Sequence, residues 1–409
     1  MKRQNFLPFE LRAALRTSRF LVLTLRLRSV QALSLLAVLL TSCQPAAPTA
    51  DPNIIMTQAV QTAFAAIQQN HATATPASTN TPAATATPEL LTPPALPPTF
   101  TTNTLSPIVT PHTYISDSCQ YLKDKWTSTN AAPGTIVFAI MFHSIEKGTG
   151  QVSDPKNIGD KDFQTMMNSL HDMGFTAINT QQLANFLYHN ASIPARSVIL
   201  IQDDRHQAQN FTDHFLPYYQ KWGWPVVTGW ISAFGGSDPY LQENVALSNQ
   251  GWVDYQAHGV VHNIPMSDSS TDEYITGELQ GSITNIQKYF NKTPVAIIWP
   301  GGGFGVRPVQ FARKFGYQLG FTINPRGPMM FNWIPLADKV DPQNPLYIPE
   351  GPVNDPLMTL PRYWPSQVVP ALDNIRQIGN AAAAYAQQNK ATELQYYNIM
   401  CAAKDGPIQ

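Results

Sequence analysis

The sequence predicts an α/β protein in which parallel strands alternate with helices. Between about residues 135 and 323, apolar runs of strand length alternate with segments of helical spacing. No internal repeat is found, and 43% of the 409 residues are apolar, enough for a sizeable core. Because parallel strands need crossover connections, this alternation favours an open doubly wound sheet or a barrel.

The elements can be placed in chain order from the same patterns. We expect strands at 135–141, 197–202, 225–232, 252–257, 295–299 and 319–323. We expect helices at 161–173, 211–222, 275–290 and 308–315. In a barrel of this type, catalytic groups lie where the strands end, at the carboxyl edge.

The N-terminus has the features of an export signal. Residues 1–42 hold seven Lys or Arg residues and one acidic residue, Glu10, and 30–40 is an apolar run too short to span a bilayer. The run ends in Leu40-Thr41-Ser42-Cys43, which resembles a bacterial lipobox. We therefore predict a lipoprotein signal peptide at 1–42, a lipid anchor on Cys43, and a location on the outer side of the cell membrane. The alternative is a buried free cysteine in a core helix.

Composition divides the rest of the chain. From 44 to 112 there are twelve prolines and only two charged residues, so 43–112 is predicted to be an extended tether. The folded part is predicted as a barrel at 113–335 and a C-terminal extension at 336–409 that packs on it. Beyond residue 42 the net charge is −7, which argues against a nucleic-acid-binding surface. No obligate protein partner is evident.

Two cysteines remain after Cys43. In an oxidising compartment an even pair favours a disulfide, and a bridge between Cys119 and Cys401 would fasten the two ends of the folded region. Two separate buried thiols are the alternative, because distance and direction cannot be derived from sequence.

Polar residues follow two of the predicted strands. Asp203 and Asp204 follow the strand at 197–202, and His258 and His262 follow the strand at 252–257. A lone H-x3-H pair is most often structural, but here two imidazoles and a carboxylate reach the same edge. Such a set could hold a divalent metal and leave a position for water.

This arrangement resembles the polysaccharide deacetylase family, the NodB homology domain of carbohydrate esterase family 4. The likeness runs from about 135 to 324 and covers Ile201-Gln202-Asp203-Asp204, His258-Gly259-Val260-Val261-His262, Trp299-Pro300-Gly301-Gly302 and the upstream Met141-Phe142-His143-Ser144-Ile145. The resemblance implies a distorted (β/α) barrel, with Asp203 as general base and Asp204, His258 and His262 as metal ligands. It implies zinc first, with cobalt, nickel or iron also suited to two nitrogens and one oxygen.

The sequence also departs from the family pattern. No histidine follows His262, so the usual general acid is absent, and the arginine that precedes the third motif is missing. Arg205 or Arg362 could replace the arginine, and His143 or His206 could donate the proton. We carry Asp203, His143 and Arg362 forward as catalytic candidates.

The third motif supplies the candidate substrate contacts. These are Trp299, Pro300 and Gly301, with the indole of Trp299 as a possible sugar-stacking surface. The alternative is that Trp299 packs in the core, as aromatic residues at strand ends usually do.

Two functions remain open on these grounds. The first is a metal-dependent hydrolase that removes N-acetyl groups, or O-acetyl groups, from a cell-surface or cell-wall polysaccharide. The second is a catalytically degenerate domain that binds carbohydrate or metal. Retention of Asp203 favours the enzyme, because binding alone does not need an unligated carboxylate. The sequence does not identify the sugar.

Overall fold

The computed structural model describes residues 92–148, 152, 154, 156–233 and 238–409. The predicted signal peptide, Cys43 and the part of the predicted tether up to residue 91 lie outside the described residues. Among the described helices, none combines the length and the apolar character that crossing a membrane requires.

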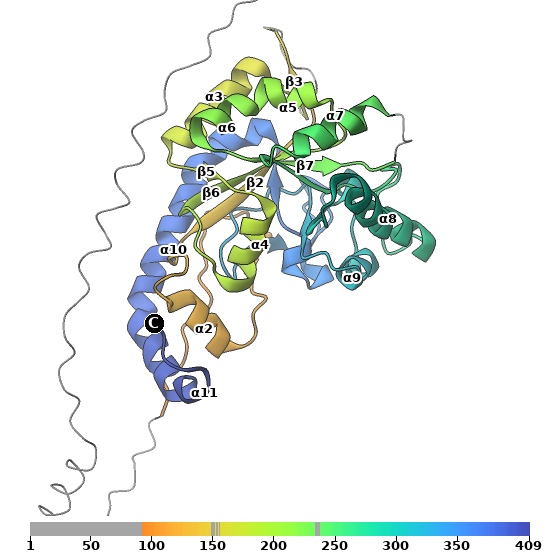
Figure 1. Ribbon diagram of the computed structural model, residues 1–409. Coiled ribbons are helices and arrows are strands. Elements are labelled where there is room, and N and C mark those ends of the chain that lie inside the picture. The colour runs from red at the N-terminus through yellow and green to blue at the C-terminus, as the bar shows by residue number, and fades with distance from the viewer. Residues whose placement is uncertain (1–91, 149–151, 153, 155, 234–237) are drawn as a thin grey trace, which may run out of the picture. The chain divides into compact units, whose positions relative to one another are not determined.

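A parallel sheet forms the centre of the folded unit (Figure 1). Its neighbouring strands follow the order β10-β9-β8-β7-β6-β2-β12, and β5 pairs with the first half of β6. The strands are β2 (Ile136–Phe142), β5 (Thr176–Ala177), β6 (Arg196–Gln202), β7 (Val226–Trp230), β8 (Val253–Ala257), β9 (Ala296–Ile298), β10 (Leu319–Phe321) and β12 (Arg362–Tyr363).

The two outer strands of this sheet meet, so the sheet is a nearly closed barrel. The amide of Leu360 donates to the carbonyl of Gly320 at 2.7 Å, and the amide of Thr322 donates to the carbonyl of Leu360 at 2.9 Å. Leu360 lies two residues before β12, while Gly320 lies in β10. These bonds favour the barrel over the open sheet, and the predicted fold class is confirmed.

Helices cover the outside of the barrel. They are α2 (Ser118–Trp126), α3 (Asp160–Asp172), α4 (Thr180–His189), α5 (Ala208–His214), α6 (Leu216–Trp222), α7 (Pro239–Ser248), α8 (Asp272–Phe290), α9 (Val306–Lys314), α10 (Pro365–Met400) and α11 (Ala402–Asp405). Short pairs lie outside the barrel: antiparallel β1 (Val109–His112) with β11 (Ile334–Ala337), and parallel β3 (Ile145–Glu146) with β4 (Ile158–Gly159). The 3-10 turns are Pro300–Gly302, Gly351–Val353 and Pro356–Met358.

Burial and capping explain why these segments fold as they do. Every residue of β2 is buried, as expected for a parallel strand covered on both faces. Helix α8 begins after Thr271, whose side chain accepts from the amide of Tyr274, and it ends at Asn291 in a left-handed conformation. Four predicted helices and six predicted strands are therefore found close to their expected places, with α5 and α6 dividing the helix expected at 211–222.

The predicted boundary of the tether at residue 112 was wrong. Residues 109–112 form β1, the carbonyl of Phe100 accepts from the indole of Trp333 at 2.8 Å, and the carbonyl of Pro98 accepts from the hydroxyl of Tyr385 at 2.7 Å. Proline has no amide to donate, but its carbonyl still accepts, so a proline-rich segment can bind along a folded surface. Residues 92–112 thus belong to the folded unit.

The predicted C-terminal extension also needs correction, because residues 336–409 contain the barrel strand β12. The long helix α10 follows this strand and packs along β2 through a buried stripe that includes Val368, Leu372 and Ile375 (Figure 1). Gly134 has a φ of +88°, and a Cβ there would lie 2.6 Å from the carbonyl oxygen of Gly379 in α10. The close approach of this helix therefore requires glycine.

A disulfide joins Cys119 in α2 to Cys401 at the end of α10. This is the pairing that the sequence favoured over two separate thiols. Cys401 is fully buried in a small cluster with Leu122 and Tyr397. The bridge thus fastens the first described helix to the last long one.

Candidate active site

The predicted site residues gather at the carboxyl edge of the barrel. His143 follows β2, Asp203 and Asp204 follow β6, and His258 follows β8. Since these strands belong to one parallel sheet, their carboxyl ends face the same way. The amide of Asp203 donates to the carbonyl of Phe142 at 2.8 Å, which continues the pairing of β6 and β2 to the site itself.

Asp204, His258 and His262 form a group that could hold a metal ion. One ligand atom from each lies within 4.8 Å of the others. Nδ1 of His258 lies 2.8 Å from the carbonyl oxygen of Ile298, which makes Nδ1 the donor and leaves Nε2 free, 3.7 Å from Asp204 Oδ1. Burial lowers the pKa of His258 to about 4, so the imidazole is neutral at pH 7, as a ligand must be. The donor set fits a divalent ion.

Two residues of this group have a left-handed backbone. The φ angles of Asp204 and His262 are +67° and +57°, a conformation that costs on the order of 1 kcal/mol or more outside glycine. Surrounding contacts must therefore hold them. For His262, one such contact is the amide of Gly301, which donates to Nε2 at 3.1 Å.

Glu278 of α8 holds the loop that carries the two histidines. Its side chain is buried, and its carboxylate accepts from the amides of Val260 at 2.9 Å, Val261 at 3.1 Å and His262 at 3.3 Å. Gly259 has a φ of +78°, and a Cβ there would lie 2.4 Å from Oε2 of Glu278. Glycine beside the first histidine is therefore a requirement of this carboxylate's position.

Asp203 forms a buried ion pair with Arg362. Nη1 of Arg362 lies 2.6 Å from Oδ1 of Asp203, and neither residue is more than 1% exposed. Nε of Arg362 donates to the carbonyl of Thr322 at 2.6 Å, so the guanidinium is anchored on both sides. Burial alone would raise the pKa of Asp203, but the charges of Arg362 and His258 outweigh it and hold the pKa below its ordinary value of 3.8.

The structure separates the two alternatives for each missing family residue. Arg205 does not reach Asp203: its Nη1 lies 2.9 Å from Asp238 Oδ2 and 3.0 Å from the carbonyl of Ala233. Nε2 of His206 lies 2.9 Å from the side-chain amide nitrogen of Gln202 and 3.1 Å from the main-chain carbonyl oxygen of Asp203. His206 therefore contacts the backbone at the site rather than its open side.

His143 lies beside the carboxylate of Asp203. Its Nε2 is 3.8 Å from Asp203 Oδ2, and its side chain is 24% exposed. The ring stacks on Trp364, with centroids 5.4 Å apart. Among the described residues, none lies within hydrogen-bond distance of Nδ1. His143 therefore lies at the same edge of the barrel as Asp203.

Sequence reasoning missed Trp364 and was wrong about Trp299. Trp299 is completely buried, and its indole N–H donates to the carbonyl of Met358 at 2.8 Å, so it packs in the core and offers no surface to a sugar. Pro300 is buried as well, whereas Gly301 is exposed and its amide contacts His262. Trp364 is half-buried beside His143, and the only signal for it was its place two residues after Arg362.

Comparison with known proteins agrees with this geometry. The family model for polysaccharide deacetylase matches residues 191–320, which contain Asp203, Asp204, His258 and His262. This segment matches a polysaccharide deacetylase domain. The putative polysaccharide deacetylase YxkH of Bacillus subtilis (strain 168) is 25% identical over 187 residues, which are 46% of this chain and 64% of that protein. The aligned region thus spans less than two thirds of that relative.

Solved deacetylase structures are similar at lower identity. The Streptococcus pyogenes deacetylase PplD in complex with acetate is 18% identical, with a TM-score of 0.45, 60% of this chain and 99% of that one being covered. A polysaccharide deacetylase from Bacillus cereus is 19% identical, with a TM-score of 0.43, 59% and 69% being covered. The matched segment of this chain, 191–320, does not include His143 or Arg362, which lie before and after it in the sequence.

Proposed function

We propose that this protein is a metal-dependent hydrolase that removes acetyl groups, N-linked before O-linked, from a cell-surface or cell-wall polysaccharide. One observation carries the proposal: an ionised, buried carboxylate, Asp203, lies directly beside a three-residue group suited to a divalent ion. Binding alone would not require that carboxylate to be kept charged. The competing function, a degenerate domain that only binds carbohydrate or metal, leaves the Asp203–Arg362 pair without a role.

Asp204, His258 and His262 would hold the ion, with zinc the best fit to two nitrogens and one oxygen. When bound, such an ion polarises an acyl carbonyl and makes a water acidic enough to be deprotonated near neutral pH. Asp203 would accept that proton, and its ion pair with Arg362, which lowers the pKa of Asp203, supports this role. We propose that the sugar would contact Trp364, which is half-buried and stacks on His143, and the exposed Gly301.

His143 is our proposed proton donor to the leaving group. An amine leaves poorly unless it is protonated, and His143 is a titratable group beside Asp203 whose side chain is partly open to solvent. His143→Gln should lower amide hydrolysis by about 10²-fold or more and ester hydrolysis by less, without loss of metal. Equal rates for parent and variant on an acetamido sugar would remove His143 from this role.

We further propose that the protein is exported and held at the membrane by lipid on Cys43. The support is the sequence alone: the basic segment, the short apolar run and the lipobox-like tetrapeptide. Metabolic labelling with a fatty acid should mark the parent and not Cys43→Ser.

The main test is acetate release. The purified protein, loaded with zinc, should release acetate from acetylated chitooligosaccharides, peptidoglycan or xylan, and a chelator should stop it. Asp203→Asn should retain the metal and lose about 10² to 10⁴ in turnover. If the fully loaded parent releases no acetate from any of these substrates, the binding function replaces the enzymatic one.

A further inference from the structure

A second hollow lies at the opposite end of the barrel from the candidate active site. It is a cavity of about 250 Å³, and its lining includes Thr135, which directly precedes β2, whereas the active-site edge begins after Phe142. The seven residues of β2 separate the two places by about 20 Å at roughly 3.3 Å per residue. In barrels of this type the amino end usually serves stability, so a lined cavity there calls for an explanation.

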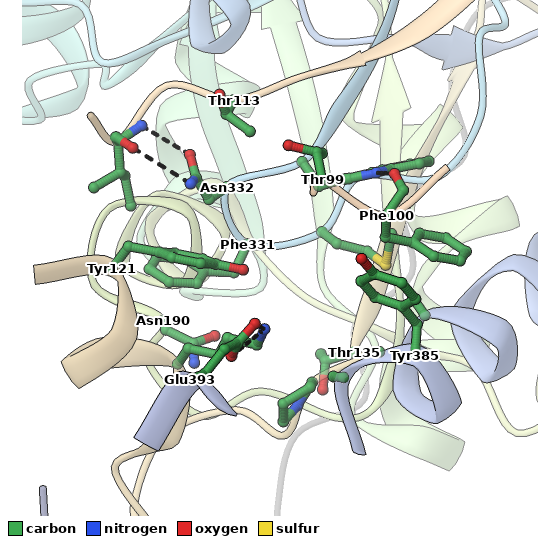
Figure 2. Close-up of a pocket in the computed structure, with 18 of the residues that line it drawn as sticks. Thr99, Phe100, Thr113, Tyr121, Thr135, Asn190, Phe331, Asn332, Tyr385 and Glu393 are labelled. Atoms are coloured by element: carbon green, nitrogen blue, oxygen red, sulfur yellow. Dashed lines mark hydrogen bonds and ion pairs between the residues drawn. The ribbon is translucent and has the colours of Figure 1, made fainter. Parts of the chain in front are cut away.

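Aromatic side chains form two sides of the cavity. Tyr121 and Phe331 stack with centroids 5.8 Å apart, and Phe100 and Tyr385 lie 5.6 Å apart. Figure 2 shows the two pairs on opposite sides of an open space, with Thr135 at its lower end and Thr99 and Thr113 at its upper end. A ligand between them would meet apolar ring surfaces on both sides.

The cavity also offers hydroxyl groups that the protein does not use. Within the described residues, the Tyr121 hydroxyl and Thr135 Oγ1 form no hydrogen bond, and neither is among the fully buried polar atoms that lack a partner, so both are open to the cavity they line. Thr135 is only 4% exposed, and burial raises the pKa of Tyr121, so its hydroxyl stays protonated. A hydroxyl has both a donor and an acceptor to offer, so a ligand hydroxyl in the cavity could bond to either group.

The charges at the cavity neutralise one another. Lys125 and Glu393 form an ion pair with Nζ and Oε2 2.8 Å apart, and their side chains are 11% and 5% exposed. The second carboxylate contact is the indole N–H of Trp126 at 2.7 Å. This pair leaves no net charge at the cavity. A charged ligand would therefore lose its hydration without gaining a group of opposite charge, which is unfavourable. A neutral ligand is favoured.

A ligand that is neutral, rich in hydroxyl groups and apolar on both ring faces is a pyranose sugar. We propose that this cavity binds one neutral sugar unit of a glycan, at a site separate from the reacting centre. Aromatic rings would contact the two faces of the sugar, and Tyr121 and Thr135 would hydrogen-bond its hydroxyls. The site is defined by its own geometry, and only the identification of the glycan with the enzyme's substrate rests on the proposed function.

Hydrogen–deuterium exchange of the full chain with the trimer of N-acetylglucosamine can test this directly. We expect the trimer to slow exchange in 118–126 and 330–333, segments that line the cavity and lie away from the active-site loops. The combined Tyr121→Phe and Thr135→Val variant keeps the ring and the side-chain volume. It should weaken the protection at these segments by about 10-fold in trimer concentration.

Tyr219→Phe is the matched control, since Tyr219 is half-buried and stacks on Trp252 far from the cavity lining. It should leave the protection unchanged. Protection confined to the active-site loops 203–206 and 258–265, or equal protection in parent and double variant, would overturn the proposal. Protection at 118–126 and 330–333 together with no acetate release would retain the sugar site and reject the enzymatic function instead.

Discussion

The candidate active site has two sides that differ in how they are built. On one side, Asp204, His258 and His262 lie on loops after β6 and β8, and the side chain of Asp204 is 37% exposed. On the other side, Asp203 is sealed from solvent by Arg362, 159 residues away in the chain. Adjacent aspartates thus occupy opposite environments.

Under the proposed function, this difference suits the neighbouring carboxylates to different tasks. A group that shares an ion with substrate and water must stay accessible, and the left-handed backbone of Asp204 turns it to the open side. A proton acceptor must stay ionised in a low-dielectric site, which requires a fixed cation beside it. The structure supplies that cation only by closing the barrel with β12.

Removal of the proposed metal ligands should have the largest effect on turnover. The double variant His258→Ala, His262→Ala removes two of three ligands, and turnover should fall by at least about 10³ because an ion contributes several kcal/mol. Elemental analysis should find about one divalent ion in the parent and almost none in the variant. Full occupancy in the variant would refute this ligand assignment.

Removal of Arg362, the cation beside Asp203, should change the pH dependence of turnover. In Arg362→Met, burial of Asp203 remains while the main charge that lowers its pKa is lost, so its pKa rises. The acidic limb of the kcat/KM profile should move to higher pH, and the free energy of unfolding should fall by about 3–5 kcal/mol because a buried charge is left unpaired.

Arg326→Met provides the comparison for that experiment. Arg326 is also buried and pairs with Glu350 at 3.1 Å, but it does not contact Asp203. Arg326→Met should lower stability without moving the acidic limb of the kcat/KM profile.

In the parent, the pKa of Asp203 is lowered in the folded state. The Asp203–Arg362 pair therefore stabilises the fold above about pH 4, and this contribution is lost as the pH falls further. An unmoved limb in Arg362→Met would separate Arg362 from the base.

A smaller effect on metal binding is expected from Glu278, whose carboxylate accepts hydrogen bonds from the loop that carries the two histidines. Glu278→Gln replaces one acceptor oxygen of the carboxylate that binds the amides of 260–262. We expect metal affinity to fall about 10- to 100-fold, as is typical when groups that orient ligands are changed. The control is Glu273→Gln, at an exposed position in the first turn of the same helix, which should leave the metal affinity unchanged. Metal titration of both variants decides whether Glu278 positions the ligands.

The smallest effect on turnover should come from the disulfide. Cys119→Ser with Cys401→Ser frees α2 from the end of α10, and the unfolding free energy should fall by about 2–5 kcal/mol. Metal content should be unchanged, because no residue of the cluster around Cys401 belongs to the candidate site. Thermal unfolding with elemental analysis measures both, and loss of metal would show that the two ends of the barrel are coupled.

The sequence by itself determined the alternation of strands and helices and the edge at which the proposed metal ligands gather. Asp203, Asp204 and His258 come directly after a strand and His262 lies on the loop that follows, and the carboxyl ends of parallel strands meet at one edge. The even number of remaining cysteines favoured a disulfide over two separate thiols, and the structure shows the bond.

Only the tertiary structure decided between candidates that compete for one place. Arg362 rather than Arg205 reaches Asp203, because β12 pairs with β2 and brings a distant residue into the core. Trp299 and Trp364 differ in the same way: the first is completely buried in the core, and the second is half-buried and stacks on His143. Local patterns determine which strand a residue follows, whereas the side chain it meets across the barrel depends on how the last strands close the sheet.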